Sequence, residues 1–156
     1  MPKRYSGFTL IELLVVIGIL GILLAIVLIA INPAAQFAQA NNTARTNDIN
    51  TVLNAVHQYA ADHRGLLPSG IPTGTAAEIA SGQGNADICA VIVPDYVSLL
   101  PVDPDTNNGV AIADCAQQGG YVTNYDIVRD ASGRVTVSAP AAEAVRGTTP
   151  VISVTR

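Results

Sequence analysis

The stretch Gly7-Phe8-Thr9-Leu10-Ile11-Glu12 joins a short basic leader to a long apolar run. From Leu13 to Ile31, nineteen residues follow without a charged or polar side chain. A charged residue costs about 2.5–3.5 kcal/mol at the centre of a membrane helix, and less near its end. Glu12 stands at the start of the run, which cannot supply a partner for its carboxylate. We therefore expect Glu12 to have a function that requires its charge.

The composition is that of one domain with an apolar appendage. The chain has 156 residues, of which 49% are hydrophobic, 13% charged and 4% aromatic, with no Trp. From Asp62 onward, ten acidic residues stand against five arginines, and this part contains no Lys. It is therefore expected to be an acidic, solvated module without a basic patch for phosphates. We expect no nucleic-acid partner, because an aromatic-rich binding platform is also lacking.

The apolar run admits three interpretations. A cleaved secretory signal would be cut at Ala38-Gln39-Ala40, but the run is longer than the usual 7–15 or so residues, and this pattern lies beyond Pro33. A plain transmembrane anchor fits the length, since nineteen residues span roughly 28 Å against a bilayer core of about 30 Å. Lys3 and Arg4 would then hold the N-terminus in the cytoplasm. The third interpretation rests on the residues on both sides of the Gly7–Phe8 bond.

Those residues are Lys3-Arg4-Tyr5-Ser6-Gly7, followed by Phe8-Thr9-Leu10-Ile11-Glu12-Leu13-Leu14-Val15-Val16. They closely resemble the class III signal of type IV pilins and type II secretion pseudopilins. The resemblance implies that a prepilin peptidase cuts between Gly7 and Phe8 and methylates the new amino group of Phe8. The apolar segment would then remain in the mature protein, in contrast to a secretory signal.

Glu12 acquires a role through this resemblance. Phe8 and Glu12 are four residues apart, so they share one face of a helix. The resemblance implies that Glu12 of an incoming subunit pairs with the Phe8 amine of a neighbour in the filament. A low dielectric constant strengthens such a pair, and only one axial offset between subunits satisfies both charges. The alternative is that the Glu12 side chain merely extends to the lipid headgroups.

Three residues weaken the predicted helix. Gly18 and Gly21 each cost up to about 1 kcal/mol relative to Ala, and Pro33 removes a backbone donor. Close helix packing in the membrane explains the two glycines. The alternative is a stretch that unwinds when the subunit leaves lipid for the filament core. In the family, a helix-breaking proline commonly lies about one turn earlier, where this chain has Ile29.

Beyond the apolar run, the helical pattern continues to about Asp62. Apolar residues recur at spacings of three and four, as on one face of an amphipathic helix: Ile49, Val52, Leu53, Val56, Tyr59 and Ala60. The Asn and Thr residues between 41 and 54 are expected on the uncovered face, and Gly65 and Pro68 end the helix. The sequence therefore predicts one rod of roughly 55 residues, about 80 Å long at 1.5 Å per residue.

The remaining sequence predicts a small head. We expect a loop at 69–86 with a helical turn near 75–79, and a short helix at 87–93. Alternating residues predict strands at 121–128, 134–138 and 151–154, with a hairpin loop at 130–133. The amphipathic helix is the expected partner of this sheet. The fold class is α+β, with a long N-terminal helix against a small antiparallel sheet, and the resemblance implies a lollipop architecture.

The predicted organisation has four parts. They are a cleaved leader at 1–7, a transmembrane and filament-core helix at 8–31, an amphipathic continuation at 32–62, and a globular head at 63–156. Cys89 and Cys115 are the only cysteines. A disulfide is expected, because the head would lie outside the cytoplasm, and two free thiols are the alternative.

No metal and no cofactor are expected. Asp103, Asp105, Asn107 and Asp114 have the oxygen spacing of a calcium loop, but Gly109 comes one residue late and Asp114 replaces the bidentate Glu. We interpret this segment as a solvated acidic turn. His57 and His63 are six residues apart without a ligand pattern, and they are expected on the surface. No phosphate loop or catalytic triad is present in the sequence, so an enzyme is not expected.

The sequence therefore predicts a structural subunit of a homo-oligomeric helical filament. A type IV pilin is the leading interpretation, and a type II secretion pseudopilin is the alternative, because Pro94-Asp95-Tyr96 and Leu99-Leu100-Pro101-Val102-Asp103-Pro104 resemble pseudopilin heads. A competence-type filament is a third variant, and a membrane-anchored binding module with an ordinary span belongs to another class. Expected partners are inner-membrane lipid, the prepilin peptidase and the filament assembly platform. The precursor would be single-pass in the inner membrane, and the filament extracellular or periplasmic.

Overall fold

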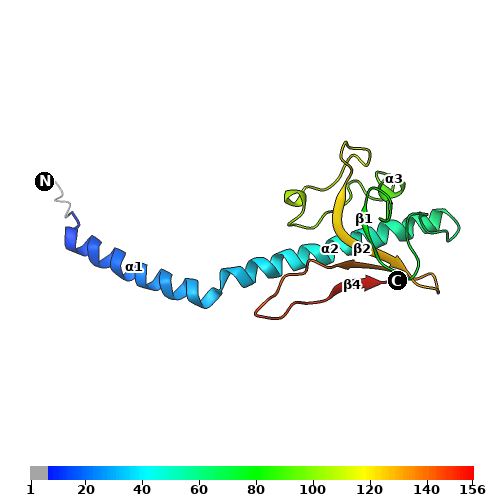
Figure 1. Ribbon diagram of the computed structural model, residues 1–156. Coiled ribbons are helices and arrows are strands. Elements are labelled where there is room, and N and C mark those ends of the chain that lie inside the picture. Colours follow the sequence, from blue (N-terminus) through cyan, green and yellow to red (C-terminus); the bar gives the residue numbers. More distant parts are fainter. Residues whose placement is uncertain (1–6) are drawn as a thin grey trace. The chain divides into compact units, whose positions relative to one another are not determined.

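The computed structural model describes residues 7–156, so the predicted leader lies outside the described residues apart from Gly7. The elements are α1 (Leu10–Ile31), α2 (Pro33–Asp62), β1 (Ala77–Ala80), α3 (Cys89–Ile92), the 3-10 turn η1 (Asn107–Gly109), β2 (Val122–Arg129), β3 (Val135–Ala139) and β4 (Ile152–Thr155) (Figure 1). The chain divides into two compact units, one ending at Phe37 and the other Ala38–Arg156. The α+β class with a long N-terminal helix is confirmed.

Helix α1 is apolar throughout after its first turn. It is long and apolar enough to cross a membrane, and none of its residues is buried in the structure. Its 22 residues correspond to roughly 33 Å, close to the bilayer core of about 30 Å. An apolar helix with no buried face requires lipid or other helices around it.

The helical region is interrupted, so the prediction of one continuous rod is wrong. Asn32 has a left-handed backbone (φ 47°, ψ 78°), and α2 begins at Pro33. A residue before proline is disfavoured in the α conformation because the proline ring crowds it, and Asn tolerates the left-handed region. The Asn32 Oδ1 atom also accepts a hydrogen bond from the Ala35 N–H at 3.4 Å. Gly18 and Gly21 lie within α1 and do not interrupt it.

The core of the second unit lies between α2 and the sheet. Four residues of the predicted apolar face are fully buried, namely Ile49, Val52, Leu53 and Val56. They belong to one cluster with β1 to β4 side chains, including Tyr125, Ile127 and Val137. Each fully buried aliphatic side chain contributes about 1.5–3 kcal/mol. This burial offsets the poor helix propensity of the Asn and Thr residues in α2.

The sheet is an antiparallel meander in the order β1-β2-β3-β4. The three predicted strands are confirmed as β2, β3 and β4. The predicted hairpin loop joins β2 to β3, where the Asp130 Oδ1 atom accepts from the N–H groups of Ser132 and Arg134 at 2.8 and 3.0 Å. The predicted helical turn near 75–79 is wrong, because Ala77–Ala80 forms strand β1 beside β2 and interrupts the predicted loop at 69–86. Its strand conformation depends on that distant partner and is not encoded locally.

Candidate functional site

The start of α1 holds the Glu12 carboxylate in a defined position. Thr9 is the N-cap residue, and its Oγ1 atom accepts from the Glu12 N–H at 3.2 Å. The Glu12 Oε2 atom accepts in return from the Thr9 N–H at 3.1 Å and from the Thr9 hydroxyl at 2.9 Å. This reciprocal arrangement is a capping box. Sequence reasoning missed this partner, although the spacing Thr9-x-x-Glu12 is the signal that indicates it.

The same carboxylate keeps one oxygen available. Within residues 7–156, no donor bonds to the Glu12 Oε1 atom. Helical side chains tilt toward the N-terminus, and the bonds to Thr9 hold the Glu12 carboxylate in that direction. The carboxylate therefore lies at the end of α1 that follows Phe8. Phe8 is 79% exposed. This end of the helix therefore presents an anionic oxygen that can accept a hydrogen bond from a cation.

A fully buried arginine on α2, Arg45, is the centre of the main polar cluster in the second unit, Ala38–Arg156, which is called the head from here on. The Arg45 Nε and Nη2 atoms donate to the two carboxylate oxygens of Asp103 at 2.7 and 3.1 Å. Nη2 also donates to Asp105 at 2.8 Å, and Nη1 donates to Glu143 at 2.8 Å and to Asn42 at 3.1 Å. All five N–H donors of the guanidinium therefore have acceptors. The cluster ties two distant loops to helix α2.

Sequence reasoning missed this cluster. Arg45 lies four residues before Ile49, so it shares the buried face of α2, and that position is the signal that indicates burial. The placement of Asn42 on the uncovered face is wrong, because Asn42 is only 7% exposed. Its side-chain amide donates to the Glu143 carbonyl at 2.8 Å, and its Oδ1 atom accepts from the Glu143 N–H at 2.9 Å.

The cluster also changes the titration of its members. The hydrogen bond from Arg45, and after it the bond from Asn41, hold the pKa of the Glu143 carboxyl below its usual value. The hydrogen bond to Asp103 raises the pKa of Arg45 above its usual value, against the opposing effect of burial. Asp48 lies outside the cluster and accepts a hydrogen bond from the Tyr125 hydroxyl at 2.7 Å. It behaves in the opposite way to Glu143, because burial raises the pKa of its carboxyl.

We expect the head to lose stability as the pH falls below about 4.5, the usual pKa of Glu143. A carboxyl whose pKa is lower in the folded state stabilises that state above its unfolded pKa, and this stabilisation is lost as the pH falls through the folded pKa. Asp48 opposes the trend, because its raised pKa makes protonation favourable to the fold. Melting temperatures between pH 7 and 3 should show a flatter decline for Glu143→Gln and a steeper one for Asp48→Asn. A Glu143→Gln curve parallel to the wild type would contradict this assignment.

The structure does not gather the four calcium candidates into one site. Asp103 is fully buried against Arg45, so its interpretation as part of a solvated turn is wrong. Asp105 also binds Arg45. Asn107 and Asp114 each bond to a backbone group of their own loop. In the part of the chain that the structure describes, no three His, Cys, Asp or Glu side chains are placed to hold a metal ion.

The two histidines have different surroundings. His63 is exposed and stacks on Tyr59, with the ring centroids 3.8 Å apart. His57 is half-buried, and its Nε2 atom is buried without a hydrogen-bond partner in the described part of the chain. The surface prediction is therefore wrong for His57.

Cys89 and Cys115 form a disulfide, which confirms the prediction. Their Cα atoms are 5.6 Å apart, within the usual range of about 4.4–6.8 Å. Cys89 begins α3 and is fully buried, whereas Cys115 lies in the largely exposed segment 113–119. The bond anchors this exposed segment to the core of the head.

Removal of the disulfide should destabilise the head by about 3–4 kcal/mol, because the bond closes a separation of 26 residues and restricts the unfolded chain. The double variant Cys89→Ala/Cys115→Ala tests this in urea unfolding of the full chain in detergent. Reduced and alkylated wild-type protein should unfold at a similar midpoint. An unchanged midpoint in both samples would contradict a stabilising role of the bond.

Comparisons with known proteins agree with the features of α1 and extend beyond them. Residues 2–28 match the family model of the prokaryotic N-terminal methylation motif. The chain is 35% identical over 102 residues to the type II secretion system core protein G of Pseudomonas aeruginosa, a match that covers 65% of this chain and 69% of that protein. No solved structure is significantly similar to the chain. The apolar helix with its methylation motif, the sheet-containing head and this relative together show that the chain belongs to the pilin and pseudopilin family, as a structural filament subunit and not an enzyme.

Proposed function

We propose that this protein is a pseudopilin, a subunit of a type II secretion filament. The observation that carries the proposal is the length of the match to the core protein G, which is 102 residues. The methylation motif covers only residues 2–28, so the similarity must include much more than the shared N-terminus. It supports the pseudopilin alternative over the type IV pilin that leads the sequence-based interpretation.

The proposed assembly mechanism uses Phe8, which directly precedes the capping box, and Glu12, which closes it. Cleavage between Gly7 and Phe8 gives Phe8 a free, methylated amine, which is a cation at neutral pH. Thr9 holds the Glu12 carboxylate at the same helix end, with Oε1 available. The amine of one subunit and the Glu12 carboxylate of its neighbour then pair in an apolar surrounding, where the attraction is strong. The pair fixes the axial offset between neighbouring copies of α1.

The apolar surface of α1 has two successive environments in this proposal. Before assembly, the segment 8–31 spans the inner membrane, with the head outside the cytoplasm. After assembly, the same surface packs against other copies of α1 in the filament core. The left-handed residue Asn32 and Pro33 form an interruption next to this segment. We propose that Pro33, together with Gly18 and Gly21, allows local unwinding during the transfer.

N-terminal mass spectrometry tests the processing step. In cells with a prepilin peptidase, the mature protein should begin at Phe8 and carry one added methyl group. The same chain expressed without the peptidase is the matched control and should keep the leader 1–7. An intact leader in both cell types would overturn the proposal and favour an ordinary membrane anchor.

A type IV pilin is the second candidate, because Gly7, Phe8 and Glu12 belong to a motif that the two filament classes share. Deletion of the gene separates them. A pseudopilin predicts loss of protein secretion with surface fibres unchanged, and a type IV pilin predicts loss of long surface fibres with secretion unchanged.

A further inference from the structure

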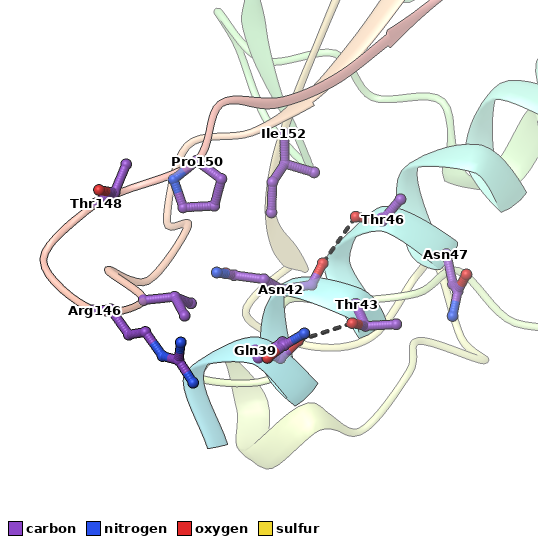
Figure 2. A pocket seen from close by; sticks show the side chains of 10 residues that line it. Gln39, Asn42, Thr43, Thr46, Asn47, Arg146, Thr148, Pro150 and Ile152 are labelled. Carbon is purple, nitrogen blue, oxygen red and sulfur yellow. Dashed lines mark hydrogen bonds between the residues drawn. The ribbon is translucent and has the colours of Figure 1, made fainter. Parts of the chain in front are cut away.

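A groove of about 680 Å³ lies beside helix α2 in the head (Figure 2). The α2 side of the groove consists of uncharged amide and hydroxyl side chains, including Gln39, Thr43 and Asn47. The facing side is formed by the segment before β4, which carries Arg146, and by the aliphatic side chain of Ile152, the first residue of β4. Arg146 is the only charged residue among those that line the groove. An occupant with hydrogen-bonding groups and a negative charge would therefore suit it.

Arg146 lies in a turn that does not itself favour arginine. Val145 and Thr148 exchange backbone hydrogen bonds of 2.8 and 3.1 Å, and Arg146 and Gly147 between them have φ values of 52° and 84°. Two-residue turns with positive φ values favour Asn, Asp or Gly. The exposed Arg146 guanidinium has no hydrogen bond or ion pair within residues 7–156, whereas Arg45 and Arg134 pair with carboxylates. The backbone therefore gives no reason for an arginine here.

The head offers few acids that remain available for such a cation. Asp103, Asp105 and Glu143 bind Arg45, and Asp130 binds Arg134. Asp87 accepts from the Tyr121 hydroxyl at 2.7 Å, and Glu78 accepts from the Asn124 N–H at 3.1 Å. A suitable acid must be exposed and free of such partners.

Asp62, Asp95 and Asp114 meet these conditions within residues 7–156. Of the three, Asp114 alone stands next to a disulfide cysteine, so its loop is the most restricted carrier of such an acid. Asp114 is exposed, and its only hydrogen bond within residues 7–156 is from the Ala116 N–H of its own loop at 2.9 Å. The adjacent Cys115 ties the loop to α3 through the disulfide. Figure 1 places the yellow-green loop of residues 110–119 on the opposite side of α2 from the orange segment of residues 140–150. The loop that carries the acid and the segment that lines the groove therefore lie on two different sides of α2.

Two different faces are what a filament requires. Identical subunits form an open helical array only when one face of each copy contacts another face of the next. We propose that the groove beside α2 receives the loop 113–119 of a neighbouring copy, with Asp114 paired to Arg146. This contact between heads rests on the proposed function as a filament subunit and adds to the pairing of Glu12 with Phe8.

The chemistry of both sides suits this contact. The amides and hydroxyls of Gln39, Thr43 and Asn47 can bond to the loop backbone, and no charged group on α2 has to lose its hydration. The disulfide already restricts the loop, so little conformational freedom is lost on binding. A partly desolvated charge pair across an interface contributes more than an exposed surface pair.

Two neutral substitutions test the contact without disturbing the local folds. Arg146→Asn places a favoured residue at a positive φ, so the melting temperature of the head should stay unchanged or rise. Asp114→Asn keeps the side-chain oxygen that accepts from Ala116. Each variant, expressed as the full chain with its assembly system, should reduce filament yield about five- to tenfold. Since the two residues act as a pair, the double variant should be no worse than either single variant.

Arg64→Asn is the matched control. Arg64 is also exposed, also has a positive φ of 57°, and lies outside the groove, so this variant should assemble as the wild type does. The inference is overturned if Arg146→Asn assembles normally, or if the two single defects multiply in the double variant. Wild-type filaments in that same experiment show that the proposed function still stands. Absence of filaments from the wild type overturns the proposed function and this contact with it.

Discussion

Replacing Arg45 with methionine should destabilise the head by about 3–5 kcal/mol. Methionine fills much of the same space, but it leaves the fully buried carboxylate of Asp103 without its cation. Asp105 and Glu143 lose the same partner, so the loops that carry them lose their attachment to α2. Urea unfolding of the full chain in detergent, followed by circular dichroism, measures the change.

Arg134→Met is the matched control for this prediction. Arg134 and Asp130 also form an ion pair of 2.7 Å, but their side chains are 67% and 36% exposed, and an exposed pair contributes less than about 1 kcal/mol. The double variant Arg45→Met/Asp103→Asn should recover part of the loss, because it removes the unpaired charge. Equal effects of Arg45→Met and Arg134→Met would show that burial does not strengthen the Arg45 cluster.

Local sequence patterns were sufficient for most of the fold. The uninterrupted apolar run predicts α1, the spacing of three and four predicts the buried face of α2, and alternation predicts β2, β3 and β4. Each of these signals lies within a single element. Helix α2 and the strands bury the side that their own patterns indicate, whereas α1 has no buried residue in the structure. The two cysteines needed only a compartment argument, because the chain offers just one possible pair.

Two of the features that sequence reasoning missed, strand β1 and the acidic partners of Arg45, depend on residues that are distant in the chain. Strand β1 has neighbours rich in Gly, Ser and Ala, and it becomes a strand through its register with β2. The three acidic partners of Arg45 lie 58 to 98 residues away, so no local pattern indicates them. Asn32 and Thr9 are different, since the residue before a proline and the spacing of a capping box are local signals.

Replacing Glu12 with glutamine should abolish filament assembly, although the helix remains intact. Glutamine serves as well as glutamate in a capping box, so the bonds to Thr9 are kept and the negative charge is lost. The proposed pair with the Phe8 amine then leaves one cation in an apolar surrounding without its anion, which costs about 2–5 kcal/mol or more at an interface. Filament yield should fall by at least about thirtyfold, while membrane fractionation finds the same amount of inserted protein.

Two further variants separate the charge from the cap. Glu12→Ala removes both, so it should fail to assemble to the same degree as Glu12→Gln. Thr9→Ala removes the cap, at a cost of about 0.5–2 kcal/mol to the helix, but keeps the carboxylate, so it should still form filaments. The opposite ranking, with normal filaments from Glu12→Gln and none from Thr9→Ala, would assign the role of this segment to helix capping. Because the capping box binds only Oε2, we expect the charge to decide, with Oε1 as the atom that accepts the neighbouring amine.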